Sequence, residues 1–297
     1  MRKDENKPNT TQYDTAYSSV AYIINYGSYS GAKSEISVYD IESESIKNNQ
    51  YEAVNGFKLT SNIQSAYVAD TLMYFMSNNA DNFDKTSAID LKAETNPIAT
   101  DIVKPRYMVA DGSTAYITCW GNVDDWSAMA TGYVAVIDLK NFSLSRKIML
   151  PGGPEGIYLK NNKLYVGLTA QQNVAVVDLS TDNLSYIPTT GITQHFVEDK
   201  NGKLWVSLVS TSTFPLQADS IGLAQIDPQT NTITGFINYK GIGSNGYVHT
   251  NPAKDTIYVM GAEAWPGTKT NIFAVDAAAK TLSTNAFVEG ESYYGLA

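Results

Sequence analysis

The chain has 297 residues, a net charge of −9 and a pI of about 4.7. Its 43% hydrophobic and 17% charged residues exclude a disordered chain. The acidic balance argues against a nucleic-acid partner, because such binding depends on Lys and Arg. The single cysteine, Cys119, excludes an intramolecular disulfide and a cysteine-cluster metal site, and no apolar run is long enough for a membrane-spanning helix.

Residues 1–19 are polar and contain no apolar run of the signal-peptide kind. We therefore expect a linker over residues 1–19, of the kind exposed when a leader is removed. A single domain is expected over residues 20–297, because a repeated phrase runs through this whole stretch and each repeat needs neighbours to cover its apolar faces.

The repeated phrase is a short apolar run that ends on an aspartate. Its copies read ISVYDI at 36–41, TSAIDL at 86–91, VAVIDL at 134–139, VAVVDL at 174–179, LAQIDP at 223–228 and IFAVDA at 272–277. The copies lie roughly 40 to 50 residues apart, which indicates a repeat architecture. We expect each aspartate to accept a backbone hydrogen bond in the turn that follows, which is a structural role.

A second strand-like run precedes every phrase, and these runs are AYIINY at 21–26, LMYFMS at 72–77, AYITCW at 115–120, LYVGLT at 164–169, LWVSLV at 204–209 and IYVMGA at 257–262. A third run precedes all but the first of these, and a fourth follows each phrase. Each repeat thus predicts four strands, named a, b, c and d, with the phrase as strand c. Strands b and c are apolar almost throughout, which predicts cover on both faces and hence an all-β fold, a β-propeller of four-stranded blades.

Six repeats are visible, and the chain ends on a run at 293–297 that matches the start of a strand a. The prediction is six blades closed by this run or a truncated seven-bladed propeller, with a slight preference for truncation. The a–b and c–d turns are short, whereas the b–c loops vary in length and composition. Since b–c and d–a connections share one face of a propeller, we expect function on this loop-rich face.

Aromatic and carboxamide side chains dominate the loop-rich face. Aromatic rings bury apolar area, while Asn, Gln and Tyr bond amides or hydroxyls without the desolvation cost of a charge. The two ligand classes that fit are a glycan and an amide-fringed macrocycle such as a corrinoid; alternatively, the loop aromatics only hold the face rigid. The candidate binding residues are Tyr26, Tyr29, Asn78, Arg106, Trp120, Trp126, Gln194, His195, Phe214, Asn245, Trp265 and Tyr293.

Catalytic signals are weak. The chain has two histidines, His195 and His249, and none of the common hydrolase, nucleotide or metal motifs. His195 with Glu155 is the one pair that could act as a general base in a propeller lyase or quinoprotein. We expect a protein that is not an enzyme and has no cofactor or metal site, and a buried, unreactive Cys119.

Four stretches carry a resemblance to a known family: the NYGSYSG loop at 25–31, the CWG strand end at 119–121, the crossing at 151–156 and WVSLVS at 205–210. Together they resemble the YncE-like, DUF5074-type propellers of Bacteroides-type bacteria, most closely the BtuG-type surface lipoproteins that capture vitamin B12 and cobinamide. Members of that family usually have seven blades.

The resemblance implies a cell-surface protein of the outer membrane, anchored by lipid on a cysteine before residue 1 and not by a membrane span. It also implies capture of a corrinoid, with cobalamin as ligand, and its transfer to a TonB-dependent outer-membrane transporter. A protein-interaction scaffold and a glycan-binding propeller are the alternatives.

Overall fold

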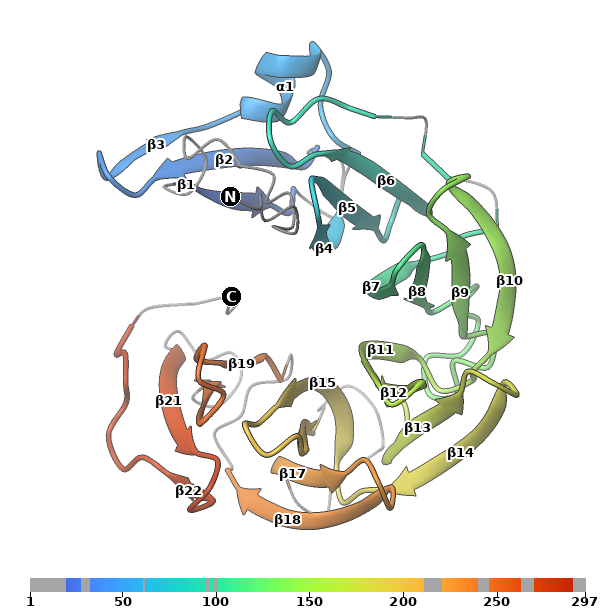
Figure 1. The fold of residues 1–297 in the computed structure, drawn as a ribbon, viewed down its shortest axis with the longest axis vertical. Helices are drawn as coiled ribbons and strands as arrows, with labels where there is room; N and C mark the ends of the chain where they lie inside the picture. The colour runs from blue at the N-terminus through green and yellow to red at the C-terminus, as the bar shows by residue number, and fades with distance from the viewer. Residues whose placement is uncertain are drawn as a thin grey trace, which may run out of the picture.

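A computed structural model describes residues 20–27, 33–60, 62–94, 97–98, 101–210, 221–239, 246–262 and 270–290. They form six antiparallel sheets that follow one another around a common axis in chain order (Figure 1). The protein is a six-bladed β-propeller, so the predicted all-β fold is confirmed. One short helix, α1 (Gln50–Asn55), lies between the first and second sheets along the chain.

The first two blades have three described strands each and the other four blades have four. The first blade consists of β1 (Val20–Asn25), β2 (Glu35–Asp40) and β3 (Ser45–Lys47), and the second consists of β4 (Ile63–Ala69), β5 (Leu72–Ser77) and β6 (Asn82–Ser87). The third blade consists of β7 (Pro105–Asp111), β8 (Thr114–Cys119), β9 (Tyr133–Asp138) and β10 (Ser143–Met149). The fourth consists of β11 (Pro154–Lys160), β12 (Lys163–Leu168), β13 (Asn173–Asp178) and β14 (Asn183–Pro188). The fifth blade consists of β15 (Ile192–Glu198), β16 (Leu204–Val209), β17 (Gly222–Asp227) and β18 (Thr232–Asn238). The sixth consists of β19 (Val248–Thr250), β20 (Thr256–Ala262), β21 (Thr270–Asp276) and β22 (Thr281–Leu282).

The predicted strand a is the innermost strand of its blade in Figure 1, as β7, β11 and β15 show. The first blade differs, because β1 corresponds to a predicted strand b and is the edge strand next to β2. The run at 293–297, which closes this blade in one of the two predicted arrangements, lies outside the described residues.

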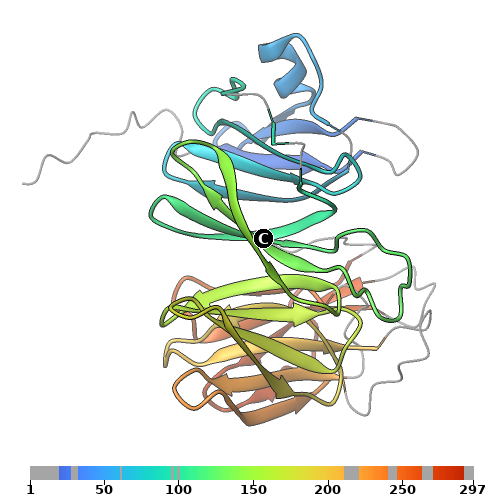
Figure 2. The same cartoon turned by 90° about the vertical axis from the view of Figure 1, so that its right-hand side faces the viewer.

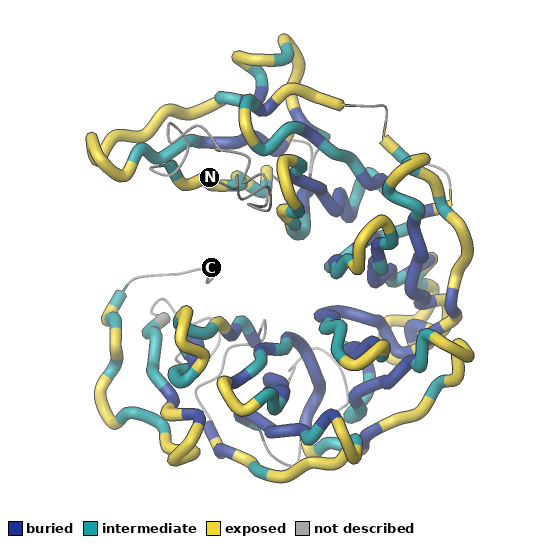
Figure 3. The backbone as a smooth tube through the Cα atoms, in the orientation of Figure 1, coloured by how far each residue is buried: buried dark blue, intermediate teal, exposed yellow. Residues whose placement is uncertain are grey.

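The continuous apolar runs arise because the two faces of each blade belong to two different cores. On β9, Val134 and Val136 pack against the fourth blade, while Tyr133, Ala135 and Ile137 pack against the second. All five residues from Tyr133 to Ile137 are therefore apolar, although successive side chains still point to opposite faces. Figure 3 shows the result, with buried residues concentrated in the middle strands and exposed residues in the turns and outer strands.

The aspartates of the repeat make the predicted turns. Asp138, for example, accepts a hydrogen bond of 2.8 Å from the Lys140 N–H, and Asp178 accepts one of 2.9 Å from Ser180. Corresponding bonds form at the other four copies, Asp40, Asp90, Asp227 and Asp276. Figure 2 shows that the loop over residues 121–132, drawn in green, extends from one end of the blades, whereas the tight turns lie at the other end.

Candidate functional site

The inner strands of the second to fifth blades share an irregular start. Their pairing registers shift between Ile63 and Ser65, Pro105 and Met108, Pro154 and Ile157, and Thr193 and Phe196. A β-bulge re-aims the side chains of the residues that it contains. The bulged residues are Gln64, Arg106, Tyr107, Glu155, Gly156, Gln194 and His195, and they form the centre of the candidate site.

Side chains on the neighbouring strands hold the bulges in place. Thr118 Oγ1 accepts from the Tyr107 N–H at 3.0 Å and donates to the Glu155 carbonyl at 2.6 Å. Ser207 Oγ accepts from the His195 N–H at 3.1 Å. Gly156 lies directly against the backbone carbonyl of Gln194, so a Cβ at this position would collide with it. The bulges are therefore rigid, as a pre-organised site requires.

Arg106 and Glu155 form a buried ion pair across the third and fourth blades. Arg106 Nη2 and Nε donate to the two Glu155 carboxylate oxygens at 2.6 and 2.8 Å, and the side chains are 11% and 5% exposed. Arg106 Nη1 also donates to Gln64 Oε1 at 2.6 Å. Burial lowers the pKa of Arg106, but the adjacent Glu155 carboxylate outweighs burial and the pKa is raised, so the guanidinium remains charged.

Two tryptophans extend this pair towards solvent. The Arg106 guanidinium lies 3.8 Å from the centre of the Trp120 ring, and Trp120 Nε1 donates to Glu155 Oε2 at 3.0 Å. Trp126, which is 44% exposed, meets Trp120 edge to face at 5.8 Å. We call the series Trp126, Trp120, Arg106 and Glu155 the tryptophan ladder; it brings three of the predicted site residues together and runs from the surface to a buried carboxylate.

His195 continues the site towards the fifth and sixth blades. Its ring stacks on Tyr247 at 5.0 Å and meets the Tyr107 ring edge-on at 4.7 Å. The Tyr107 hydroxyl accepts from Gln64 Nε2 at 3.2 Å, and burial raises the pKa of Tyr107 well above its ordinary value. These contacts run from Gln64 through Tyr107 and His195 to Tyr247, and we call these four residues the belt; it extends from the second blade to the sixth. His195 therefore lies between two tyrosine rings. Both Glu155 oxygens accept hydrogen bonds from Arg106.

The remaining predicted residues make other contacts. Asn78 and Gln194 are buried; the amide of Asn78 donates to the Pro105 carbonyl at 3.5 Å and that of Gln194 to Thr169 Oγ1 at 3.2 Å. Tyr26 is half-buried at the end of the first blade, and its carbonyl accepts from Ser34. The five that fall outside the described residues are Tyr29, Phe214, Asn245, Trp265 and Tyr293.

Tyr107 is the belt residue that the sequence did not indicate. Regular alternation places adjacent strand residues on opposite faces, so Arg106 and Tyr107 were not expected to serve the same site. The bulge between Pro105 and Met108 removes that restriction. A polar residue recurs at each of these strand starts, and at Arg106 and Gln194 a second polar or aromatic residue follows it; this pattern is the signal that could have identified Tyr107.

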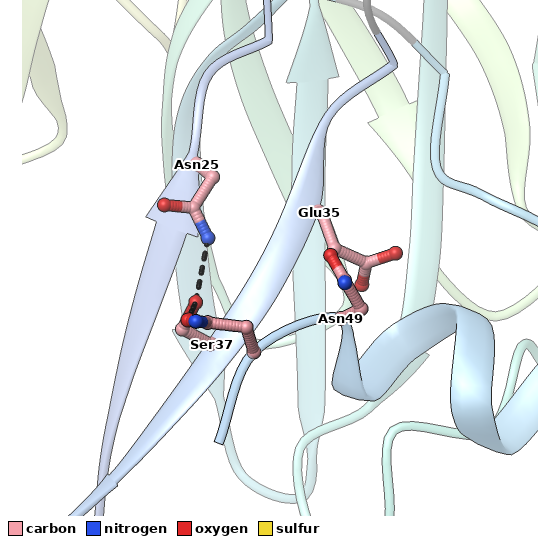
Figure 4. Close-up of a pocket in the computed structure, with 5 residues that line it drawn as sticks. Asn25, Glu35, Ser37 and Asn49 are labelled. Atoms are coloured by element: carbon pink, nitrogen blue, oxygen red, sulfur yellow. Dashed lines mark hydrogen bonds between the residues drawn. The ribbon is translucent and has the colours of Figure 1, made fainter. Parts of the chain in front are cut away.

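A separate pocket of about 300 Å³ lies at the loop-rich end of the first blade (Figure 4). Asn25 Nδ2 donates to Ser37 Oγ at 2.8 Å, and this hydroxyl donates to Asn48 Oδ1 at 2.7 Å. Glu35 Oε1 accepts a hydrogen bond from the N–H of Ile36 on β2 and another from the N–H of Tyr51 at the start of α1. The second bond means that this carboxylate caps the helix. The pocket thus presents amides and a hydroxyl.

Among the residues that the structure describes, no three His, Cys, Asp or Glu side chains gather as a metal site would require. The described part of the chain also contains no helix long and apolar enough to cross a bilayer.

The fold and the belt define a β-propeller with a pre-formed polar and aromatic site at one end of its axis. Residues 20–295 match the family described as a domain of unknown function, DUF5074, and the chain belongs to this family. The family resemblance read from the sequence is thereby confirmed at this level. No curated protein matches the chain.

Solved structures support the fold at low sequence identity. A 6-phosphogluconolactonase candidate from Bacteroides uniformis is 10% identical, with a TM-score of 0.63 over 89% of this chain and 80% of that one. A second candidate for this enzyme, from Bacteroides fragilis, is 13% identical, with a TM-score of 0.61 over 90% and 80%. Hydrazine synthase from Kuenenia stuttgartiensis is 15% identical, with a TM-score of 0.60 over 73% of this chain and 63% of that one. Identities this low support the propeller fold alone.

Proposed function

We propose that the protein is a non-catalytic binding protein that captures a corrinoid on the loop-rich face of the propeller. The observation that carries the proposal is the tryptophan ladder, in which an exposed indole, Trp126, rests on a second indole that a buried ion pair holds in place. A surface that is already ordered loses little conformational entropy when a ligand binds.

The chemistry of a corrinoid matches this surface. The macrocycle is broad and largely apolar in its centre, which suits contact with indole and tyrosine rings. Its rim carries carboxamide arms, and the candidate site contains uncharged hydrogen-bonding groups at Gln64, Tyr107 and Gln194. The sequence also predicts Tyr29, Phe214, Asn245, Trp265 and Tyr293 as binding residues, and these lie outside the described residues.

The proposal includes the cellular setting implied by the family resemblance. The protein would be held at the outer surface of the outer membrane by a lipid and would deliver its ligand to a TonB-dependent transporter. The propeller fold of this DUF5074 family member suits a binding or scaffold role. The corrinoid is the more specific part of the proposal, and experiment must test it.

Titration of the protein with cyanocobalamin, followed by calorimetry and tryptophan fluorescence, tests the proposal. We expect binding in the micromolar range or tighter and a loss of about tenfold or more in the Trp126→Ala variant, since an aromatic contact is worth about 1–3 kcal/mol. Tyr186→Ala is the matched control, because Tyr186 is also 44% exposed but lies on the outer strand β14. No heat and no spectral change at high micromolar ligand would refute the corrinoid proposal.

Exposed apolar side chains around α1 favour protein docking as a second candidate function. Val54 and Phe57 are 45% and 55% exposed, and such side chains are typical of contact surfaces when they cluster. Selective recovery of an envelope protein by the wild type but not by a Val54→Ser/Phe57→Ser variant, together with no corrinoid binding, would favour the scaffold. Binding of an oligosaccharide in place of both would favour the glycan alternative.

A further inference from the structure

We infer that Glu155 makes this site selective for neutral carboxamide side arms over anionic carboxylate arms. It does so by cancelling the charge of Arg106. The inference rests on the proposed function, because it specifies which form of a corrinoid-like ligand the site accepts.

An arginine near a ligand surface ordinarily attracts carboxylates and phosphates, since its planar fork matches their oxygens. In this site a protein carboxylate already occupies that fork. Glu155 accepts two hydrogen bonds from Arg106 at 2.6 and 2.8 Å, and Gln64 Oε1 accepts a third bond from the same guanidinium. The pair is therefore neutral as a unit.

The burial of the pair strengthens the effect. Arg106 and Glu155 are 11% and 5% exposed, so solvent screens their charges only weakly. A ligand carboxylate approaching Arg106 would lose its hydration and would also meet the negative charge of Glu155. The described side chains that bond to the pair or stack on it, Gln64 and Trp120, supply no positive charge to offset this cost.

A carboxamide carries no charge, so it loses less hydration free energy than a carboxylate and is not repelled by Glu155. Its carbonyl oxygen can accept from an N–H of Arg106, and its NH₂ group can donate to a lone pair of the Glu155 carboxylate. A carboxylate offers acceptors only, so it cannot donate to Glu155 and its negative charge is repelled by that of Glu155. The two kinds of ligand arm differ in the NH₂ donor, which only the carboxamide has. The selectivity therefore depends both on the charge of Glu155 and on the kind of arm.

The test compares two corrinoids that differ in their arms. Dicyanocobinamide carries carboxamides, whereas dicyanocobyrinic acid carries carboxylates. Dissociation constants for both are measured at pH 8, above the ordinary titration range of histidine. The proteins compared are the wild type, Glu155→Gln, Arg106→Gln and the double variant, with Glu42→Gln as the control that changes the net charge equally at an exposed turn. Thermal melts first establish that each variant is folded.

We expect the wild type to bind the amide form more tightly than the acid form. Glu155→Gln should narrow this preference by about tenfold because Arg106 is then uncompensated, and Arg106→Gln should widen it by a similar factor. The double variant and Glu42→Gln should leave the preference close to that of the wild type, because the site remains neutral in both.

Two results separate the inference from the proposed function. If neither ligand binds the wild type, the corrinoid proposal fails and this inference falls with it. If the amide form binds but the preference is the same in all variants, the inference alone is wrong. Should the single variants not fold, the double variant still decides: a wider preference there would show that Arg106 attracts anions in the wild type, which overturns the inference.

Discussion

Two buried serines on equivalent strands should respond oppositely to the same mutation. Ser207 lies on β16, the second strand along the chain in its four-stranded sheet, and is 0% exposed. Ser77 lies on β5, the second strand along the chain in its three-stranded sheet, and is 1% exposed. Ser207 Oγ accepts from the bulged His195 N–H at 3.1 Å. In contrast, Ser77 Oγ has no hydrogen-bond partner among the residues that the structure describes.

Ser207→Ala leaves the His195 N–H buried without an acceptor, which costs about 1–3 kcal/mol of the free energy of unfolding. Ser77→Ala removes a buried hydroxyl that makes no bond, so its effect should lie between zero and a gain of about 1 kcal/mol. The two variants should therefore differ by at least about 1 kcal/mol, or roughly 2 °C in Tm for a chain of this size.

Urea unfolding followed by far-UV circular dichroism, together with thermal melts, measures both variants against the wild type. Near-UV spectra add a second readout, because Ser207→Ala should loosen the His195 and Tyr247 rings. Equal losses in the two variants would refute the reasoning that the bulge needs the serine acceptor.

Three further predictions concern acid stability, backbone packing and thiol reactivity. Burial raises the pKa of Glu198, but hydrogen bonds from two lysines outweigh it and lower the pKa from 4.5 to about 2. The ionised Glu198 therefore stabilises the fold above about pH 4.5, and this stabilisation is lost as the pH falls towards 2. Urea unfolding at pH 6 should give the wild type a free energy of unfolding roughly 1–3 kcal/mol above that of Glu198→Gln, and this difference should vanish near pH 2. Gly156→Ala should cost about 3 kcal/mol by the same assay because its Cβ meets the Gln194 carbonyl, whereas Gly112→Ala, at φ 53° in open space, should cost about 1 kcal/mol. Burial raises the pKa of Cys119 to about 12, so a thiol reagent at pH 8 should modify the native protein far more slowly than the unfolded chain.

Each of these has a clear contrary outcome. An unchanged gap between wild type and Glu198→Gln down to pH 2 would show that the lysine bonds do not lower its pKa. A harmless Gly156→Ala would contradict the close approach of the fourth and fifth blades. Rapid labelling of native Cys119 would mean that its strand opens readily.

The repeat determined the architecture from the sequence alone. An apolar phrase ending in aspartate, as at Asp138 and Asp178, specifies both the strand and its turn through local chemistry, and local chemistry is readable in the letters. The same holds for the apolar run of β16, where every residue is buried. The assignment of loops to one face followed from the alternation of short and long connections.

Only the tertiary structure decided how the site residues meet. The sequence marked Arg106 and Trp120 as ligand contacts, but the partner of Arg106 is Glu155 of the next blade, 49 positions further along the chain. Nothing in either local sequence specifies that pairing, because it depends on how two bulged strands approach one another at the axis. Bulges arise from the balance of pairing between strands, and they placed Tyr107 beside His195 against the ordinary alternation. The kinds of side chain at the site were thus set by the sequence, whereas their neutralised charge was set by the packing of blade on blade.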